Sequence, residues 1–386
     1  MSRCEYLPFG KPNFSDQEIA AVARVLRSGW IGMGPETIAF EQELADYLGA
    51  RHVVTVNSCT SALFLALLVS GVGPGDEVIC PSFTWCSTAN AALYVGAKPV
   101  FCDIDADTLC PTVEHVLAKV TPRTKAVMVV HFGGLAVDVG ALRTALPQGM
   151  AIIEDAAHAL GARFNNRMWV GSSGNLTCLS FYANKNLSTG EGGAIALSDE
   201  SMAEHLRSLR QHGLPLDAWK RFTHKQSLLL SEPLATLGYK MNYTDLQACI
   251  GRVQLARQSE FDAIRLDIAR RYVDGLKELS PPLTFQKDCT HPHHARHLFV
   301  LQLPLERLRP ARDDLLLALR ARNIGASIHY APLHRMPLYA GGCEPVSLPT
   351  TEQVAGRIMT LPISASMTPN DAEDVLAEFK AVLKGS

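Results

Sequence analysis

The sequence contains no apolar run of the roughly 18 uninterrupted residues that a membrane-spanning helix requires. Residues 62–69 come nearest, and this run has only the length of a short helix before Ser70-Gly71 ends it. Residues 1–11 are charged and broken by proline and glycine, and they lack the apolar core of a signal peptide. We therefore expect a cytoplasmic protein with no membrane partner.

The sequence also lacks paired cysteines and an excess of charge of one sign. None of the ten cysteines forms a C-x-x-C pair and several lie in apolar runs, which favours buried free thiols over disulfides. The 36 Lys and Arg residues balance 38 Asp and Glu residues to a net charge of −2. Because a general nucleic-acid-binding protein carries a basic excess, we expect no nucleic-acid partner. A site for an acidic small molecule needs only local positive charge, so such a ligand stays possible.

Apolar residues make up 47% of the chain, enough for a large core, and the length predicts two or three domains. Over the first two thirds, short apolar runs alternate with helix-like stretches such as 61–69 and 88–95. The expected strands are residues 52–56, 77–80, 99–103, 126–131, 151–154, 177–181 and 194–197. Because these runs are mostly apolar, without clean alternation, and are separated by helices, they predict an α/β fold. Its parallel sheet would be covered by helices on both faces.

The pattern changes near Thr244. A long stretch with helical spacing, residues 246–276, is closed by Pro281-Pro282. A strand-like run at 297–303 follows, with helix-like runs at 312–322 and 369–383. These features predict a large α/β domain at residues 1–248 and a smaller α+β domain at residues 249–386, joined through a long helix.

Polar residues follow several strands, at the edge where open α/β sheets bind their ligands. Residues 57–61, Asn-Ser-Cys-Thr-Ser, lie between a strand and a helix. Free backbone N–H groups and the helix dipole favour an anion such as phosphate there. The alternative is an ordinary helix cap by Thr60 or Ser61.

Three single residues at strand ends each allow two interpretations. Asp155 could cap the next helix or hold a protonated ring nitrogen. Lys185 lies between an apolar strand and a glycine-rich turn, so it could be a surface charge or a partly desolvated amine able to form a Schiff base. Trp85 could belong to the core or form the platform for a flat ligand.

The histidines of residues 291–297 suggest a metal site, but no tetrahedral set of Cys or carboxylate ligands lies near them in the sequence. A solvated loop and a contact to a sugar phosphate are the alternatives. We expect no metal.

Four motifs occur in a fixed order along the chain. They are Ser-Cys-Thr-Ser-Ala-Leu at 58–63, Pro-Ser-Phe-Thr-Trp at 81–85, Glu-Asp-Ala-Ala-His at 154–158, and Lys-Asn-Leu at 185–187 with Gly-Glu-Gly-Gly at 190–193. In this order they resemble the DegT/DnrJ/EryC1/StrS family of pyridoxal-phosphate-dependent sugar aminotransferases. The resemblance continues through residues 209–213, 244–248 and 329–334, and so covers nearly the whole chain. It implies fold type I, with a mainly parallel seven-stranded sheet.

The resemblance implies roles for the residues that match these motifs. Lys185 resembles the lysine that forms the internal aldimine with pyridoxal 5′-phosphate and then moves the proton. Asp155 resembles the carboxylate that pairs with the pyridine nitrogen. Trp85 matches the aromatic residue that stacks on the ring, and His158 lies at the position near its phenolic oxygen.

The phosphate-binding residues of the family are matched by Cys59 and Thr60, through their backbone groups, and by the Ser180 hydroxyl. A further phosphate contact usually comes from the second subunit of a homodimer, through an Asn-x-Arg stretch. This chain departs there, with Lys240 where the family often has Asn and Asn242 where it often has Arg. Lys240 could still bind an anion.

The implied reaction moves an amino group from an amino acid, expected to be L-glutamate, to a nucleotide-linked keto sugar for polysaccharide biosynthesis. His329 and His334 are expected at the substrate. The motifs at 84–88, 155–158 and 294–299 look closest to enzymes that aminate C4 of UDP-linked 4-keto sugars, as in the 4-amino-4-deoxy-arabinose and pseudaminic-acid pathways. A sugar dehydratase or lyase and a non-catalytic regulator stay open as alternatives. Dehydrating relatives replace the lysine with histidine, and a regulator would not need Lys185, Asp155 and Trp85 together.

Overall fold

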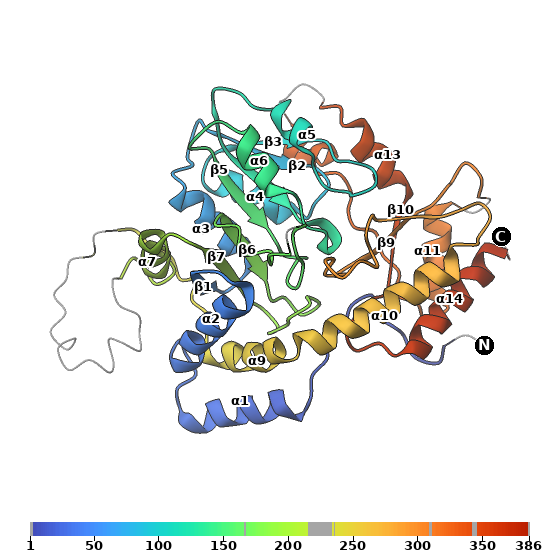
Figure 1. Ribbon diagram of the computed structural model, residues 1–386, viewed down its shortest axis with the longest axis horizontal. Helices are drawn as coiled ribbons and strands as arrows, with labels where there is room; N and C mark the ends of the chain where they lie inside the picture. The colour runs from blue at the N-terminus through green and yellow to red at the C-terminus, as the bar shows by residue number, and fades with distance from the viewer. Residues whose placement is uncertain are drawn as a thin grey trace.

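A seven-stranded sheet forms the centre of the larger part of the chain (Figure 1). The computed structural model describes residues 3–165, 167–214, 234, 236–308, 311–341 and 346–384. The strand order is β1-β7-β6-β5-β4-β2-β3, in which β7 runs antiparallel to both β1 and β6 and the other neighbouring pairs are parallel. The strands are β1 (His52–Val56), β2 (Glu77–Pro81), β3 (Lys98–Cys102), β4 (Thr124–Val130), β5 (Ala151–Asp155), β6 (Leu176–Ser180) and β7 (Gly193–Leu197). The predicted α/β fold with a mainly parallel seven-stranded sheet is confirmed.

Both faces of the sheet are buried under helices, which explains why its strands are mostly apolar. In β2, for example, Val78 and Cys80 pack into one apolar cluster with α3 and α4, whereas Ile79 packs into another with α5 and α6. The helices of this part are α1 (Asp16–Ser28), α2 (Pro35–Leu48), α3 (Cys59–Val69), α4 (Cys86–Tyr94), α5 (Val113–Leu117), α6 (Val139–Ala145) and α7 (Glu200–Leu209), with the 3-10 turn η1 (Phe132–Gly134).

The last third of the chain builds a small antiparallel sheet, β10-β9-β8, against three helices. Its elements are α10 (Gln258–Leu276), β8 (Thr284–Phe285), β9 (Phe299–Gln302), α11 (Arg312–Ala321), η3 (Leu333–Arg335), α12 (Pro337–Ala340), α13 (Pro349–Arg357), β10 (Ile358–Leu361) and α14 (Pro369–Lys384). The division into domains stays a prediction, and its boundary after residue 248 falls inside helix α9 (Asp245–Ala256).

The long helix expected over residues 246–276 is wrong, because α9 and α10 are separate helices that meet at Arg257 (Figure 1). Arg257 has φ −98° and ψ 5°, outside helical geometry. Its guanidinium is held by Glu18 at 3.1 Å and Glu260 at 3.1 Å. No proline or glycine lies at this break, and the helical spacing of apolar residues continues across it, so the sequence pattern does not indicate the break.

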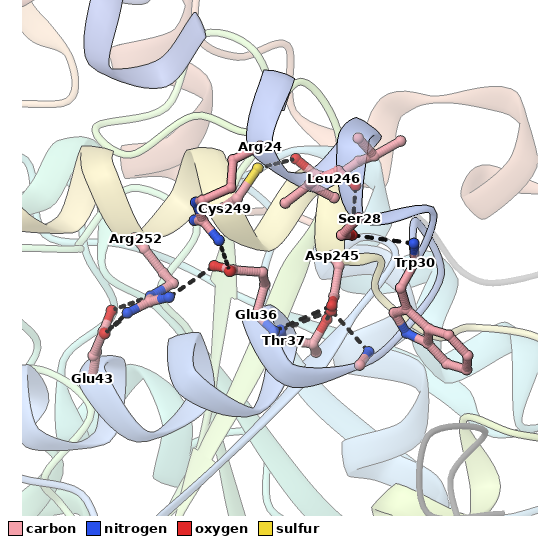
Figure 2. A network of polar contacts seen from close by, with 12 residues as sticks. Arg24, Ser28, Trp30, Glu36, Thr37, Glu43, Asp245, Leu246, Cys249 and Arg252 are labelled. Carbon is pink, nitrogen blue, oxygen red and sulfur yellow. Dashed lines mark hydrogen bonds and ion pairs between the residues drawn. The ribbon is translucent and has the colours of Figure 1, made fainter. Parts of the chain in front are cut away.

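A buried carboxylate links the start of α9 to the start of α2 (Figure 2). Asp245 accepts hydrogen bonds from the backbone N–H groups of Gly34 and Thr37 at 2.8 and 2.9 Å, and from the Thr37 hydroxyl at 2.7 Å. Beside it, Glu36 pairs with Arg24 and Arg252. The N-terminus of α2 is therefore capped from a residue that lies more than 200 positions later in the chain.

The nine described cysteines are free thiols, and most are buried. Cys4 is exposed, so the prediction of a buried thiol is wrong there, and Cys343 lies outside the described residues. None of the helices in the described ranges is long and apolar enough to cross a membrane.

Candidate active site

A cavity of about 430 Å³ lies where the carboxyl ends of β5 and β6 meet the start of α3. The predicted site residues that line it are Cys59, Thr60, Trp85, Asp155, His158, Ser180, Lys185 and His329. Segments from both ends of the chain complete the wall, through Phe9 and Tyr330. The structure therefore gathers most of the predicted site around one space.

Lys185 lies in a turn directly after β6, and its backbone N–H donates to the Tyr182 carbonyl at 2.9 Å. Burial lowers the pKa of its amine to about 8, against an ordinary value of 10.5, while Cys59 and Asp155 act in the opposite direction. A lysine with a lowered pKa is a better nucleophile near neutral pH.

Asp155 ends β5 and is 5% exposed. Its Oδ2 accepts a hydrogen bond from the Thr88 hydroxyl at 2.7 Å, and its Oδ1 accepts one from the Ala157 N–H at 3.1 Å. Burial raises the pKa of this carboxyl, and both hydrogen bonds oppose that rise. The carboxylate is thus oriented and ready to pair with a cationic group.

The N-terminus of α3 forms the end of the cavity that suits a phosphate. Ser58 caps the helix, with its hydroxyl accepting from the Ser61 N–H at 3.1 Å, so the alternative of a cap by Thr60 or Ser61 is wrong. Cys59 and Thr60 are already helical, and their N–H groups belong to the unpaired first turn. Gly193 lets β7 pack closely against the start of α3, since a Cβ there would lie 2.6 Å from the Cys59 nitrogen.

Trp85 is an exposed aromatic residue at the rim of the cavity, with 59% of its surface accessible. Its ring centroid lies 5.7 Å from that of Tyr330, at an angle of 51°. A large apolar side chain gains little from such exposure in the absence of a ligand, which favours a platform for a planar ring over a place in the core.

Two side chains outside the predicted set, Tyr330 and His297, contact predicted site residues. The Tyr330 hydroxyl lies 3.3 Å from His158 Nε2, and the ring of His297 lies 4.6 Å from that of His158. His297 Nε2 lies 3.4 Å from Lys185 Nζ. Both residues occur within motifs that were recognised, at 294–299 and 329–334, but no pattern singled them out.

The remaining predicted residues do not line the cavity. Lys240 donates a hydrogen bond to the side-chain oxygen of Asn242, and Lys240 is exposed. His334 is buried between Ser82 Oγ at 2.7 Å and Glu352 Oε1 at 3.1 Å, so both of its ring nitrogens have protein partners. The expected substrate contact by His334 stays a prediction.

A larger cavity of about 730 Å³ is lined by Asn186, which follows the lysine, and by a basic group of side chains: Arg163, Arg167, Arg265, His291 and His293. None of the predicted site residues lines it. Within the described ranges, no group of three or more His, Cys, Asp or Glu side chains could hold a metal ion.

Comparison with known proteins defines the class. The model of the DegT/DnrJ/EryC1/StrS aminotransferase family matches residues 12–380. The spore coat polysaccharide biosynthesis protein SpsC of Bacillus subtilis is 41% identical over 389 residues, which span 100% of this chain and 99% of SpsC. The chain belongs to the DegT/DnrJ/EryC1/StrS aminotransferase family, and the prediction of an aminotransferase is confirmed.

Solved structures agree with this assignment. The aminotransferase TlmJ from Streptoalloteichus hindustanus is 35% identical, with a TM-score of 0.88 over 98% of this chain and 99% of TlmJ. Spr1654 from Streptococcus pneumoniae in its PMP-form is 30% identical, with a TM-score of 0.90 over 98% of this chain and 99% of that one. The predicted fold type I architecture is confirmed by these matches.

The residues of the cavity fit pyridoxal phosphate. The unpaired N–H groups at the start of α3 suit its phosphate, the exposed Trp85 suits its ring, and Asp155 suits a protonated ring nitrogen. Lys185 is the amine in the same space.

Proposed function

We propose that this protein transfers an amino group from L-glutamate to the C4 keto carbon of a nucleotide-linked sugar. The observation that carries the proposal is the convergence of Lys185, Asp155 and Trp85 on one cavity. The cofactor is pyridoxal 5′-phosphate, a prediction confirmed by the family match and by the PLP-form and PMP-form of Spr1654. The donor, the sugar and the position of amination are our proposals.

The bound cofactor supplies an electron sink for the carbon that loses or gains a proton. Lys185 would supply the amine that binds it, and the same amine, once free, would act as the base that accepts and returns the proton. Asp155 keeps the ring nitrogen protonated, because a buried anion beside it favours the charged form. Trp85 would support the ring, and Ser180 with the N–H groups of Cys59 and Thr60 would hold the phosphate, since all four residues line the cavity.

The choice of a nucleotide-linked sugar is supported by the family and by SpsC, which is named for spore coat polysaccharide biosynthesis. Within the cavity, His329 and Tyr330 offer polar groups for a sugar. Burial lowers the pKa of His329 to about 4, so its imidazole is neutral. A neutral imidazole can contact a sugar hydroxyl without repelling the amine of Lys185.

We further propose that the enzyme works as a homodimer with shared sites. Among the described residues that line the cavity, Lys185 is the single Lys or Arg, and it is committed to the chemistry. A phosphate dianion bound only by neutral N–H groups and a hydroxyl lacks a cationic partner. Lys240 lies outside its own cavity and is exposed, which suits a contact with the phosphate of the partner subunit.

The proposed function is tested by absorption spectroscopy on the purified enzyme, before and after addition of L-glutamate. We expect a visible cofactor band that bleaches with glutamate and returns with a 4-keto sugar, tested with UDP-, GDP- and dTDP-linked compounds. Lys185→Ala is the control without a covalent attachment. A band that ignores glutamate would refute the donor, and a preference for a 3-keto sugar would refute C4.

A further inference from the structure

His297 reaches Lys185 from the carboxy-terminal part of the chain. Its Nε2 lies 3.4 Å from Lys185 Nζ, and its side chain is 2% exposed. Burial lowers the pKa of His297 well below its ordinary value, with Lys185 and His158 adding to the effect. The ring is therefore neutral, and its Nε2 lies within hydrogen-bond distance of the amine.

Lys185 is the sole hydrogen-bonding partner of the His297 ring within the described part of the chain. The other ring nitrogen, Nδ1, is buried with no partner there. An unpartnered buried polar atom is unfavourable for folding, so this arrangement is poorly explained by stability alone. Its one polar contact points to a task at Lys185.

The segment that carries His297 is held firmly on both sides. The Ala295 and Leu298 N–H groups donate to the carbonyls of Gly134 at 2.9 Å and Gly133 at 3.2 Å. Between them, the Arg296 backbone has φ +50°, a region that residues other than glycine rarely adopt. The Arg296 guanidinium pairs with Asp262. Backbone strain of this kind persists where surrounding contacts impose it, and it is frequent at functional sites.

We propose that His297 is a positioning residue for Lys185. It accepts a hydrogen bond from Nζ whenever the amine is not attached to the cofactor, and so holds the amine in place for proton transfer. This inference rests on the proposed function, because an amine that is released and recaptured in every cycle needs a second partner. Asp155 is unsuited to that task, since the ring nitrogen occupies it in the loaded enzyme.

Other groups also face Lys185, so the experiment must separate the effect of His297 on the Lys185 pKa from theirs. The Cys59 thiol on α3 and the Asp155 carboxyl on β5 favour the ammonium form of Lys185. The neutral imidazoles of His158 and His329 face it as well, since Lys185 helps to lower the pKa of each. These four groups stay in place when His297 alone is changed.

The experiment measures the pKa of Lys185 in the cofactor-free protein by competitive acetylation across pH, with peptide mass spectrometry. In His297→Leu, we expect the pKa to fall below its wild-type value by about 1 or more, because the ammonium loses its acceptor. His297→Gln keeps an acceptor oxygen and should restore most of the difference. In the loaded enzyme, His297→Leu should slow bleaching by saturating glutamate about 10- to 100-fold, with little change in the glutamate KM.

His294→Gln is the matched control, a buried histidine on the same segment. It contacts Gln286 at 3.3 Å and the Arg296 N–H at 2.8 Å, and it does not line the cavity. It should leave the pKa of Lys185 unchanged. His297→Met serves as a second variant without an acceptor, should His297→Leu fold poorly.

An unchanged Lys185 pKa and an unchanged bleaching rate in folded His297→Leu or His297→Met would overturn this inference. A wild-type band that ignores glutamate would instead refute the proposed donor. The titration of Lys185 in the cofactor-free protein would then still decide the role of His297.

Discussion

The hydroxyl of Thr88 donates a 2.7 Å hydrogen bond to Asp155 Oδ2, which links helix α4 to the end of strand β5. Thr84 Oγ1 lies 2.9 Å from the same hydroxyl. Because Thr88 donates to the carboxylate, it must accept from Thr84. This chain of hydroxyls orients the carboxylate and favours its charged form against the burial that raises its pKa.

Replacing Thr88 with Val should therefore weaken binding of pyridoxal phosphate by about 10-fold, since a hydrogen bond to a charged group is lost. The dissociation constant is measured by titrating cofactor-free protein and following the visible absorption. Thr88→Ser keeps the hydroxyl and should bind nearly as well as the wild type. Equal affinity of Thr88→Val and wild type would show that Thr88 does not support Asp155.

Trp85→Ala should reduce cofactor affinity about 5- to 10-fold, because an aromatic stacking partner contributes on the order of 1 kcal/mol. Trp85→Phe should recover part of that loss. The stability of the cofactor-free protein should change little, within about 0.5 kcal/mol, since the side chain is 59% exposed. Thermal unfolding with and without cofactor separates the two effects, and a large loss of stability without cofactor would place Trp85 in the core instead.

Lys185 should destabilise the cofactor-free fold. Its pKa is about 8 in the folded protein against 10.5 for an ordinary lysine, so the unfolded chain binds more protons between these values. Stability should thus rise as pH increases from about 8 to 10.5, and the penalty is fully present below pH 8. Lys185→Met should be more stable at pH 7 by about 1–2 kcal/mol and should lose this pH dependence. Denaturant unfolding at pH 7 and pH 10 measures both, with Lys240→Met as an exposed control.

Asp245→Ala should destabilise the protein by about 2–4 kcal/mol, because it leaves the Gly34 and Thr37 N–H groups at the start of α2 without their buried acceptor (Figure 2). Cofactor affinity per folded molecule should stay close to the wild-type value, since Asp245 does not line the cavity. Urea unfolding measures the first effect and absorption titration the second. A variant with wild-type stability would contradict the capping role.

The strands could be predicted because they are buried on both faces, so their apolar character is continuous and easily seen. All seven expected strands are present, with ends within two residues of those observed. The direction of β7 could not be predicted in the same way, because a fully buried strand looks alike in either orientation. The break at Arg257 was hidden for a different reason, since ion pairs with Glu18 and Glu260 hold that conformation and leave no local mark.

The site could be predicted where chemistry and chain order coincide. Lys185 and Trp85 each follow a strand and Asp155 is the last residue of one, and the carboxyl ends of neighbouring strands meet in space. His297 and Tyr330 come from the carboxy-terminal part of the chain, and only tertiary packing brings them to Lys185 and His158. The same holds for Phe9, whose ring lies 4.9 Å from that of His329.

Shared active sites can be tested with two inactive variants. Lys185→Ala lacks the reactive amine, and Lys240→Ala should lose most phosphate affinity, by about 10-fold or more, if its ammonium serves the partner subunit. When equal amounts are unfolded together and reassembled, a C2 dimer with shared sites regains wild-type pairs in about a quarter of its sites. Activity at limiting cofactor should rise accordingly above that of either variant alone. Two Lys185→Ala preparations mixed in the same way are the control, and an unchanged activity in the mixed sample would mean that Lys240 does not act across a subunit boundary.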